Sequence, residues 1–296
     1  MKIGDWKATE SLNQIFREIR ELGLESHLAE LEAYGFTVIE NALSPEFTAQ
    51  LREATVREYE RRFKAKINVE TGENFEDWQL APYLLYKDPT FADLTLHQKA
   101  LALVSYFLGK GAILFSLVSH MKGPGGKGRA LHADNSGMMP APFAPYEQIV
   151  SVQYFLTDYD EAKGAFAVVP GTHREARRPT RGESSLSGPE KNALAIPVEA
   201  PAGSAVVFLG KLWHGSYPRT EPGLRVDITA AYVRPYISQM EDYKNTVTPE
   251  FLERFGGRES RMAQLMGLNT YYGYRNEGID EGMLRLQNEF GRTWQG

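Results

Sequence analysis

AGSAVVFLGKLWHGSYPRTEPGLRVDITAAYV, residues 202–233, contains two apolar runs separated by a segment rich in Gly and Pro. The runs 204–209 and 224–233 are short and contain many β-branched residues, which is typical of strands. His214 lies between them, and Arg225 stands near the start of the second run. The stretch therefore predicts two strands that carry an imidazole and a guanidinium.

Short segments of strand character continue on the N-terminal side of this stretch. They lie at 36–39, 112–120, 128–133, 147–157, 165–169 and 194–199, with Pro and Gly clusters at the turns. Several short strands at such spacing favour a β-sandwich or barrel. The segment 173–192 is polar and lies between two of these strands, so we expect a long exposed loop.

Helical patterns flank the strands. Apolar residues at helical intervals predict helices within 8–34, broken at Gly23, and over Leu94 to Leu108. Ser44 and Pro45 are a typical N-cap and first helical residue, which predicts a helix that reaches about Phe63. The chain becomes helical again after Pro235. We therefore expect one domain over 1–296, with a helical N-terminal part (1–110), a β core (111–236) and a helical C-terminal part (237–296).

The composition excludes several classes of protein. With 42% hydrophobic residues and a net charge of −5, the chain of 296 residues is globular and has no broad basic surface for nucleic acid. It has no cysteine, so disulfides and thiolate zinc sites are excluded. The first residues do not resemble a secretory signal, and no apolar run approaches the roughly 20 residues that cross a bilayer. A soluble cytoplasmic protein without membrane or nucleic-acid partners is expected, and a homodimer is left open.

The segment RALHADNSG, residues 129–137, supplies two candidate metal ligands. Residues i and i+2 of a strand point to the same face, so His132 and Asp134 can present an imidazole and a carboxylate to one point. An H-x-D triplet alone is weak support. If the strand pair brings His214 to this point, the three side chains form a 2-His-1-carboxylate set, which suits Fe(II) and leaves three positions open. Zinc with the same ligands is chemically feasible and would favour hydrolysis.

Arg225 favours one co-substrate. A guanidinium 11 residues after His214 can hold a carboxylate by two parallel hydrogen bonds. The dicarboxylic acid 2-oxoglutarate chelates iron at one end and needs a fixed cation at the other. The hydroxyl of Ser216 can add a donor to that far carboxylate.

The ordered motifs resemble the phytanoyl-CoA dioxygenase family of Fe(II)/2-oxoglutarate-dependent oxygenases. YGFTVIENALSPE (34–46), HAD (132–134), VSVQYFLTDYDEAKGAFAVVPGTH (150–173) and PAGSAVVFLGKLWHGSYPRTEPGLR (201–225) carry the resemblance. It implies a mainly β fold, a double-stranded β-helix (a cupin-like jelly-roll), with flanking helices. It also implies Fe(II), 2-oxoglutarate and O2 as cofactor and co-substrates. By resemblance, the metal ligands are His132, Asp134 and His214, and the co-substrate residues are Arg225, Ser216 and Gln153.

The chain departs from the family pattern at two positions. Leu131 precedes the first ligand where many relatives have an aromatic residue, and Arg219 stands where an asparagine is common. Asp134 is retained, whereas the related halogenases have a small residue there to make room for halide. Hydroxylation or desaturation of a small or medium organic molecule is therefore favoured over halogenation.

Other candidates have structural interpretations. We expect the remaining histidines to be structural: His27, His97 and His120 as satisfied side chains, and His173 as a turn residue. The arginines between Arg174 and Arg181 are interpreted as a solvated loop, with contact to an anionic substrate as the alternative. The tyrosines Tyr271, Tyr272 and Tyr274 are expected to pack. A cupin-like divalent-metal isomerase or hydrolase and a non-catalytic ligand-binding protein stay as rival functions.

Overall fold

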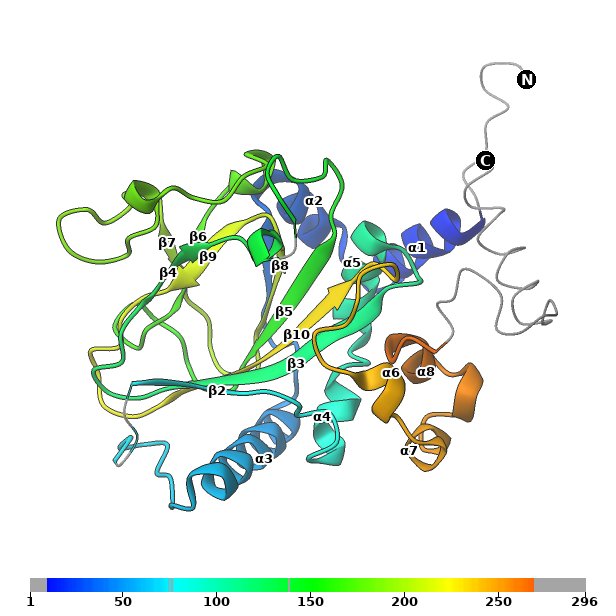
Figure 1. The fold of residues 1–296 in the computed structure, drawn as a ribbon, viewed down its shortest axis with the longest axis horizontal. Coiled ribbons are helices and arrows are strands. Elements are labelled where there is room, and N and C mark those ends of the chain that lie inside the picture. Colours follow the sequence, from blue (N-terminus) through cyan, green and yellow to red (C-terminus); the bar gives the residue numbers. More distant parts are fainter. Residues whose placement is uncertain (1–9, 74, 76, 138, 269–296) are drawn as a thin grey trace.

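Two antiparallel sheets face each other in the computed structural model, which describes residues 10–73, 75, 77–137 and 139–268 (Figure 1). The six-stranded large sheet has the order β1 (Phe36–Ile39), β8 (Ala205–Leu209), β5 (Ile149–Phe155), β10 (Arg225–Val233), β3 (Ile113–Lys122), β2 (Trp78–Ala81). The four-stranded small sheet has the order β4 (Arg129–His132), β9 (Trp213–Ser216), β6 (Phe166–Val169), β7 (Ile196–Val198). This arrangement confirms the predicted jelly-roll.

The predicted strands are confirmed within a few residues at their ends, but β2 and β9 were not predicted. Each of these two strands has only four residues, and β9 follows β8 after a tight turn at Gly210. The division of the chain into 1–110, 111–236 and 237–296 stays a prediction. Two strands from the first of these parts, β1 and β2, form the two edges of the large sheet.

The N-terminal helices follow the sequence signals except at one point. Helices α1 (Glu10–Glu21) and α2 (Glu25–Tyr34) are separated at Gly23, and Ser44 caps α3 (Pro45–Phe63) by accepting a hydrogen bond from the amide of Phe47. The predicted helix from Leu94 to Leu108 is wrong at its start. Instead, α4 (Pro89–Leu94) begins at a proline that Asp88 caps, and α5 (Gln98–Leu108) follows after a break.

Three short helices follow the large sheet in the sequence: α6 (Tyr243–Thr246), α7 (Pro249–Glu253) and α8 (Arg261–Leu265). Residues 269–296 of the predicted helical C-terminal part, with Tyr271, Tyr272 and Tyr274, lie outside the described residues. None of the helices that the structure describes is both long enough and apolar enough to span a bilayer.

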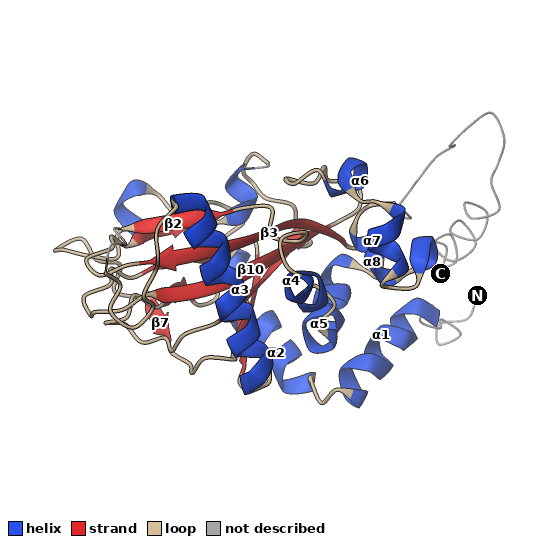
Figure 2. Cartoon of the chain, turned by 90° about the horizontal axis from the view of Figure 1, so that it is seen from below, coloured by secondary structure: helices blue, strands red, loops and turns tan. Residues whose placement is uncertain are grey.

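The helices cover one face of the large sheet, and α3 lies across its strands (Figure 2). The hydroxyl of Tyr59 on α3 donates to the carbonyls of Gln79 (3.0 Å) and Ser119 (2.9 Å), which fixes the helix to β2 and β3. Alternate residues of β10 are apolar and enter this core: Val226, Ile228, Ala230 and Tyr232. Because side chains alternate along a strand, Arg225, Asp227 and Thr229 face the small sheet. The inner face of the large sheet is therefore polar along β10.

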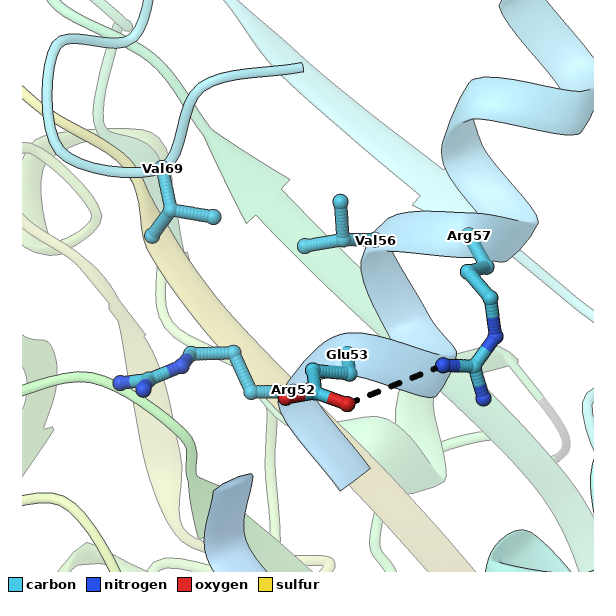
Figure 3. A pocket seen from close by; sticks show the side chains of 5 residues that line it. All are labelled: Arg52, Glu53, Val56, Arg57 and Val69. Atoms are coloured by element: carbon cyan, nitrogen blue, oxygen red, sulfur yellow. Dashed lines mark ion pairs between the residues drawn. The ribbon is translucent and has the colours of Figure 1, made fainter. Parts of the chain in front are cut away.

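A shallow hollow on the helical side has no feature of a catalytic site (Figure 3). It lies at α3 and is lined by Arg52, Glu53, Val56, Arg57 and Val69. Glu53 and Arg57 form an exposed ion pair at 3.9 Å. Because α3 covers the outer face of the large sheet, this hollow is separated by that sheet from the inner polar face.

The 173–192 loop packs on the outer face of the small sheet. It contains two short 3-10 turns, η2 (Thr172–Arg174) and η3 (Arg181–Glu183). Arg177 pairs with Glu183 (2.8 Å) and stacks over Trp213 at 4.5 Å, and the indole of Trp213 donates to the carbonyl of Arg177 (2.9 Å). Trp213 faces away from the neighbouring His214, so these contacts hold the loop against the outside of the barrel. Arg177 therefore fits the structural interpretation of the loop.

Candidate metal centre

The structure brings His132, Asp134 and His214 together between the two sheets. His132 ends β4, Asp134 begins the 3-10 turn η1 (Asp134–Gly137), and His214 lies directly opposite His132 on β9. One ligand atom from each residue lies within 4.8 Å of the other two. The Nε2 atoms of His132 and His214 are 3.8 and 3.4 Å from Asp134 Oδ1. Ligands on one face of an octahedral ion with bonds of about 2.1 Å lie about 3 Å apart, so this spacing suits a metal ion.

The hydrogen bonds of the two imidazoles use their Nδ1 atoms and leave their Nε2 atoms free to bind a metal ion. His132 Nδ1 lies 3.0 Å from the carbonyl of Ala130, and His214 Nδ1 lies 2.9 Å from the carbonyl of Leu212. A carbonyl only accepts, so Nδ1 must carry the proton and Nε2 the lone pair. His132 Nε2 is buried and has no hydrogen-bond partner. Such a pattern is what metal-bound histidines require, since their other nitrogen is usually held by an acceptor.

The electrostatics of the cluster agree with a cation site. Burial, followed by the neighbouring His214, lowers the pKa of His132 to about 3, so the ring stays neutral at neutral pH. Burial alone would raise the pKa of Asp134, but the two imidazoles bring it below its ordinary range. Asp134 is therefore ionised, and its second oxygen accepts a hydrogen bond from Ser151 Oγ at 3.3 Å. One anion and two neutral lone pairs face the same point.

Arg225 lies deeper between the sheets and is buried. Its guanidinium donates to the carbonyl of Gly164 (2.6 Å) and to Asp227 Oδ2 (3.3 Å), and stacks over Tyr159. Its Nε is buried without a partner, and each terminal nitrogen keeps a second N–H beyond the hydrogen bond given above. Sequence analysis did not identify Asp227, although it stands two residues after Arg225 and so must share its face.

Asp227 is fully buried and has several donors around it. His120 Nδ1 donates at 2.9 Å and the hydroxyl of Tyr159 at 2.7 Å. Burial by itself would raise the pKa of Asp227, yet the charge and hydrogen bond of His120 bring it below its ordinary range. The aspartate is thus an ionised partner that uses part of the donor capacity of Arg225.

Ser216 and Gln153 both lie on inner faces of the sheets. Ser216 follows His214 by two residues on β9, and its Oγ accepts hydrogen bonds from Lys122 Nζ (2.8 Å) and the amide of Arg129 (3.3 Å). Gln153 shares a face of β5 with Ser151, which contacts Asp134, and Gln153 Oε1 is buried without a partner. Lys122 was missed by sequence analysis and is fully buried.

The four histidines outside the triad occupy structural positions. His27 bonds to Thr37 (2.8 Å), His97 to the carbonyl of Ala42 (3.0 Å) and His120 to Asp227. His173 is buried against Gly35 at the start of the 173–192 loop. Arg219 is also structural, because its guanidinium closes a turn by donating to the carbonyls of Lys163 (2.9 Å) and Pro222.

The sequence of the chain matches the family model described as phytanoyl-CoA dioxygenase over residues 31–226, which is well over half of the chain. The chain belongs to the phytanoyl-CoA dioxygenase family. This confirms the resemblance seen in the motifs and the predicted class of enzyme, a non-haem iron and 2-oxoglutarate-dependent dioxygenase.

Two curated relatives match this dioxygenase over most of their own length. Dioxygenase af480 of Aspergillus fumigatus is 27% identical over 263 residues, which are 87% of this chain and 81% of that protein. Ectoine dioxygenase of Nocardia farcinica is 25% identical over 235 residues, covering 69% of this chain and 76% of that protein.

Solved structures share the fold of this dioxygenase at lower sequence identity. HygX from Streptomyces hygroscopicus, crystallised with nickel and 2-oxoglutarate, is 19% identical with a TM-score of 0.59 and covers 73% of this chain and 89% of that chain. The epimerase SnoN from nogalamycin biosynthesis is 20% identical with a TM-score of 0.54 and covers 73% of this chain and 84% of that chain.

Proposed function

We propose that His132, Asp134 and His214 hold Fe(II) in this dioxygenase, and that 2-oxoglutarate binds between this ion and Arg225. The observation that carries the proposal is the convergence of two proton-free Nε2 atoms and one ionised carboxylate on a single point. Three protein ligands leave three octahedral positions for 2-oxoglutarate and O2. When bound, iron and its co-substrates supply an oxidant that removes hydrogen from the substrate, with release of succinate and CO2.

The distance along β9 supports the orientation of the co-substrate. His214 and Ser216 point to the same side, and two residues of a strand span about 7 Å. With its keto acid end on the metal, 2-oxoglutarate would have its far carboxylate held by Ser216 and Arg225. Gln153, with its unpartnered Oε1, lies on the face of the large sheet that lines this path.

The side chains around the triad fix the ligands and exclude water. Ser151 orients Asp134 through its hydrogen bond. The rings of Phe208 and Phe166 pack against the imidazole of His214, with ring centroids 4.7 and 5.5 Å from it. An apolar wall protects a reactive oxidant from solvent and leaves the bound substrate as the group that it attacks.

We infer that the substrate is a small or medium organic molecule. The inner face of the large sheet also presents Leu80, which is 41% exposed, and the partly exposed Val118 and Thr229. Leu80 and Val118 offer apolar side chains at this face, and Thr229 adds a hydroxyl. HygX has been crystallised with hygromycin B and SnoN with nogalamycin RO, both small molecules, which supports this substrate class. Because Asp134 occupies the position that a halide would need, hydroxylation or desaturation is the expected outcome.

The test measures succinate formation with iron, ascorbate and a library of candidate substrates. We expect His132→Ala, Asp134→Ala and His214→Ala each to abolish turnover, because each removes one ligand. His27→Gln is the matched control, since His27 bonds to Thr37 away from the triad. Unchanged succinate yield in the three ligand variants would contradict the proposal. Substrate conversion without O2 would instead support the divalent-metal isomerase or hydrolase.

A further inference from the structure

A lysine lies buried beside the proposed co-substrate site. Lys122 ends β3 and stands opposite Arg225 in the register of β10, so both side chains enter the space between the sheets. It has no exposed surface. Its Nζ donates to Ser216 Oγ and to the carbonyl of Tyr217, both at 2.8 Å. Both acceptors are neutral, so neither of these two hydrogen bonds is an ion pair.

Two glycines make room for the stem of this lysine. A Cβ built on Gly126 would lie 2.6 Å from Lys122 Cγ, and one built on Gly164 would lie 3.2 Å from Lys122 Cδ. The carbonyl of Gly164 also accepts the hydrogen bond from Arg225. Side chains at either glycine would displace the lysine, so the local sequence allows its amine to reach the inner site.

The charges around Lys122 do not balance. Asp227 is the fully buried carboxylate of this cluster among the described residues, and Arg225, His120 and Tyr159 already donate to it. Arg219 adds another buried cation, whereas Asp77 provides a further negative charge on the side of β2. Burial, and next the charge of Arg225, lower the pKa of Lys122 to about 6. An additional carboxylate would pair with this amine and restore its proton.

We propose that Lys122 is a second cation of the co-substrate site, and that its ammonium binds the far carboxylate of 2-oxoglutarate together with the free Nε–H of Arg225. This inference rests on the proposed function above. Arg225 has part of its donor capacity already in use, because Gly164 and Asp227 each accept one hydrogen bond from its terminal nitrogens, and the charge of Asp227 offsets part of its own. Ser216, which accepts from Lys122, lies about 7 Å beyond His214 along β9, where the far carboxylate ends.

The experiment measures binding without turnover. The Ni(II)-loaded protein is titrated calorimetrically with 2-oxoglutarate and, separately, with 2-oxopentanoate, which has the same chain length but no far carboxylate. Lys122→Met keeps an unbranched stem without charge, and Lys122→Arg restores a cation. Lys66→Met is the matched control, because Lys66 is 93% exposed and pairs with Glu60 at the surface.

We expect Lys122→Met to weaken 2-oxoglutarate binding about 10- to 100-fold, the range for a hydrogen bond to a charged group, and to leave 2-oxopentanoate binding unchanged. Lys122→Arg should recover part of the loss, and Lys66→Met should bind both acids as the wild type does. Equal weakening of both acids would overturn the inference, because it would indicate a general structural effect. Unchanged 2-oxoglutarate binding in Lys122→Met would overturn it too. If the wild-type Ni(II) protein binds neither acid, the proposed function itself fails.

Discussion

The burial of Lys122 predicts that Lys122→Met stabilises the protein when no metal or co-substrate is bound. The pKa of Lys122 falls from its ordinary 10.5 to about 6 in the folded protein. Between these values the unfolded chain binds a proton that the folded chain lacks. Stability therefore rises with pH across this window, by at most about 1.4 kcal/mol per pH unit, and falls as the pH drops towards 6.

The size of the effect follows from the same shift. At pH 7 the folded protein holds the amine of Lys122 without its proton. This lowers the free energy of unfolding by about 5 kcal/mol, compared with a side chain that never ionises. Removal of the amine also leaves Ser216 Oγ and the carbonyl of Tyr217 with one donor fewer, which costs about 1–3 kcal/mol. Lys122→Met should thus be more stable than the wild type by about 2–4 kcal/mol at pH 7. The advantage should shrink by about 2.7 kcal/mol between pH 7 and pH 9.

Urea unfolding with excess chelator at pH 7, 8 and 9, followed by tryptophan fluorescence, measures this difference. All other titrating groups are common to both proteins, so their contributions largely cancel. Lys66→Met serves again as the control and should show the pH profile of the wild type. Parallel profiles for wild type and Lys122→Met would refute the reasoning, because they would mean that the amine is equally protonated in both states.

Four further predictions concern the ligands and the packing. Asp134→Asn keeps the shape but removes the charge, and competitive chelation should show a loss of Fe(II) affinity larger than the about 10- to 100-fold typical of outer-shell changes. Ser151→Ala should lie within that range, because it removes only the hydrogen bond to Asp134; an effect as large as that of Asp134→Asn would mean that Ser151 binds metal. Tyr59→Phe should lower the free energy of unfolding by about 1–3 kcal/mol in urea, with turnover per folded molecule unchanged. Trp213→Phe leaves the carbonyl of Arg177 without its donor and should speed proteolysis within 173–192; an unchanged cleavage rate would show that other contacts hold this loop.

The triad was predictable because its geometry is mostly local. His132 and Asp134 are two residues apart, so strand alternation predicted them on one side, and they stay together although β4 ends at His132 and Asp134 begins η1. His214 needed one additional assumption, that a second strand returns beside the first, and the direct pairing of His132 with His214 in β4 and β9 confirms it. The position of Arg225 followed from the same strand pattern.

Lys122 and Asp227 could not be predicted as partners of the site because their roles depend on pairing between distant strands. In the sequence, Lys122 is an ordinary polar residue near the end of a strand. The register of β3 with β10 is what brings it opposite Arg225. Its exact depth depends on two glycines, Gly126 and Gly164, that belong to different loops. Sequence patterns report which face a side chain takes, but not which residue lies across from it.

The break between α4 and α5 shows a different limit. Leu94 and Leu101 are seven residues apart, as are Leu96 and Leu103, so helical periodicity alone favours a continuous helix. The structure ends α4 at Leu94 because Thr95 is buried and its carbonyl accepts a hydrogen bond from the hydroxyl of Tyr232 on the large sheet. A tertiary contact thus decides a local boundary, whereas the Asp88 and Pro89 signals for the start of α4 were present in the sequence.

The low pKa of buried Lys122 also predicts how co-substrate binding changes the stability of the folded protein with pH. A ligand that binds only the folded state stabilises it by about 2.7 kcal/mol at 100 times its dissociation constant. If 2-oxoglutarate restores the proton on Lys122, this binding takes up a proton, so its affinity falls as the pH rises from 7 to 9. The shift in melting temperature that 2-oxoglutarate produces in the Ni(II) protein should then shrink over this range, and it should be small and nearly independent of pH in Lys122→Met. A shift in the wild type that does not change between pH 7 and pH 9 would instead place the carboxylate on a group that keeps its charge throughout, such as Arg225 alone.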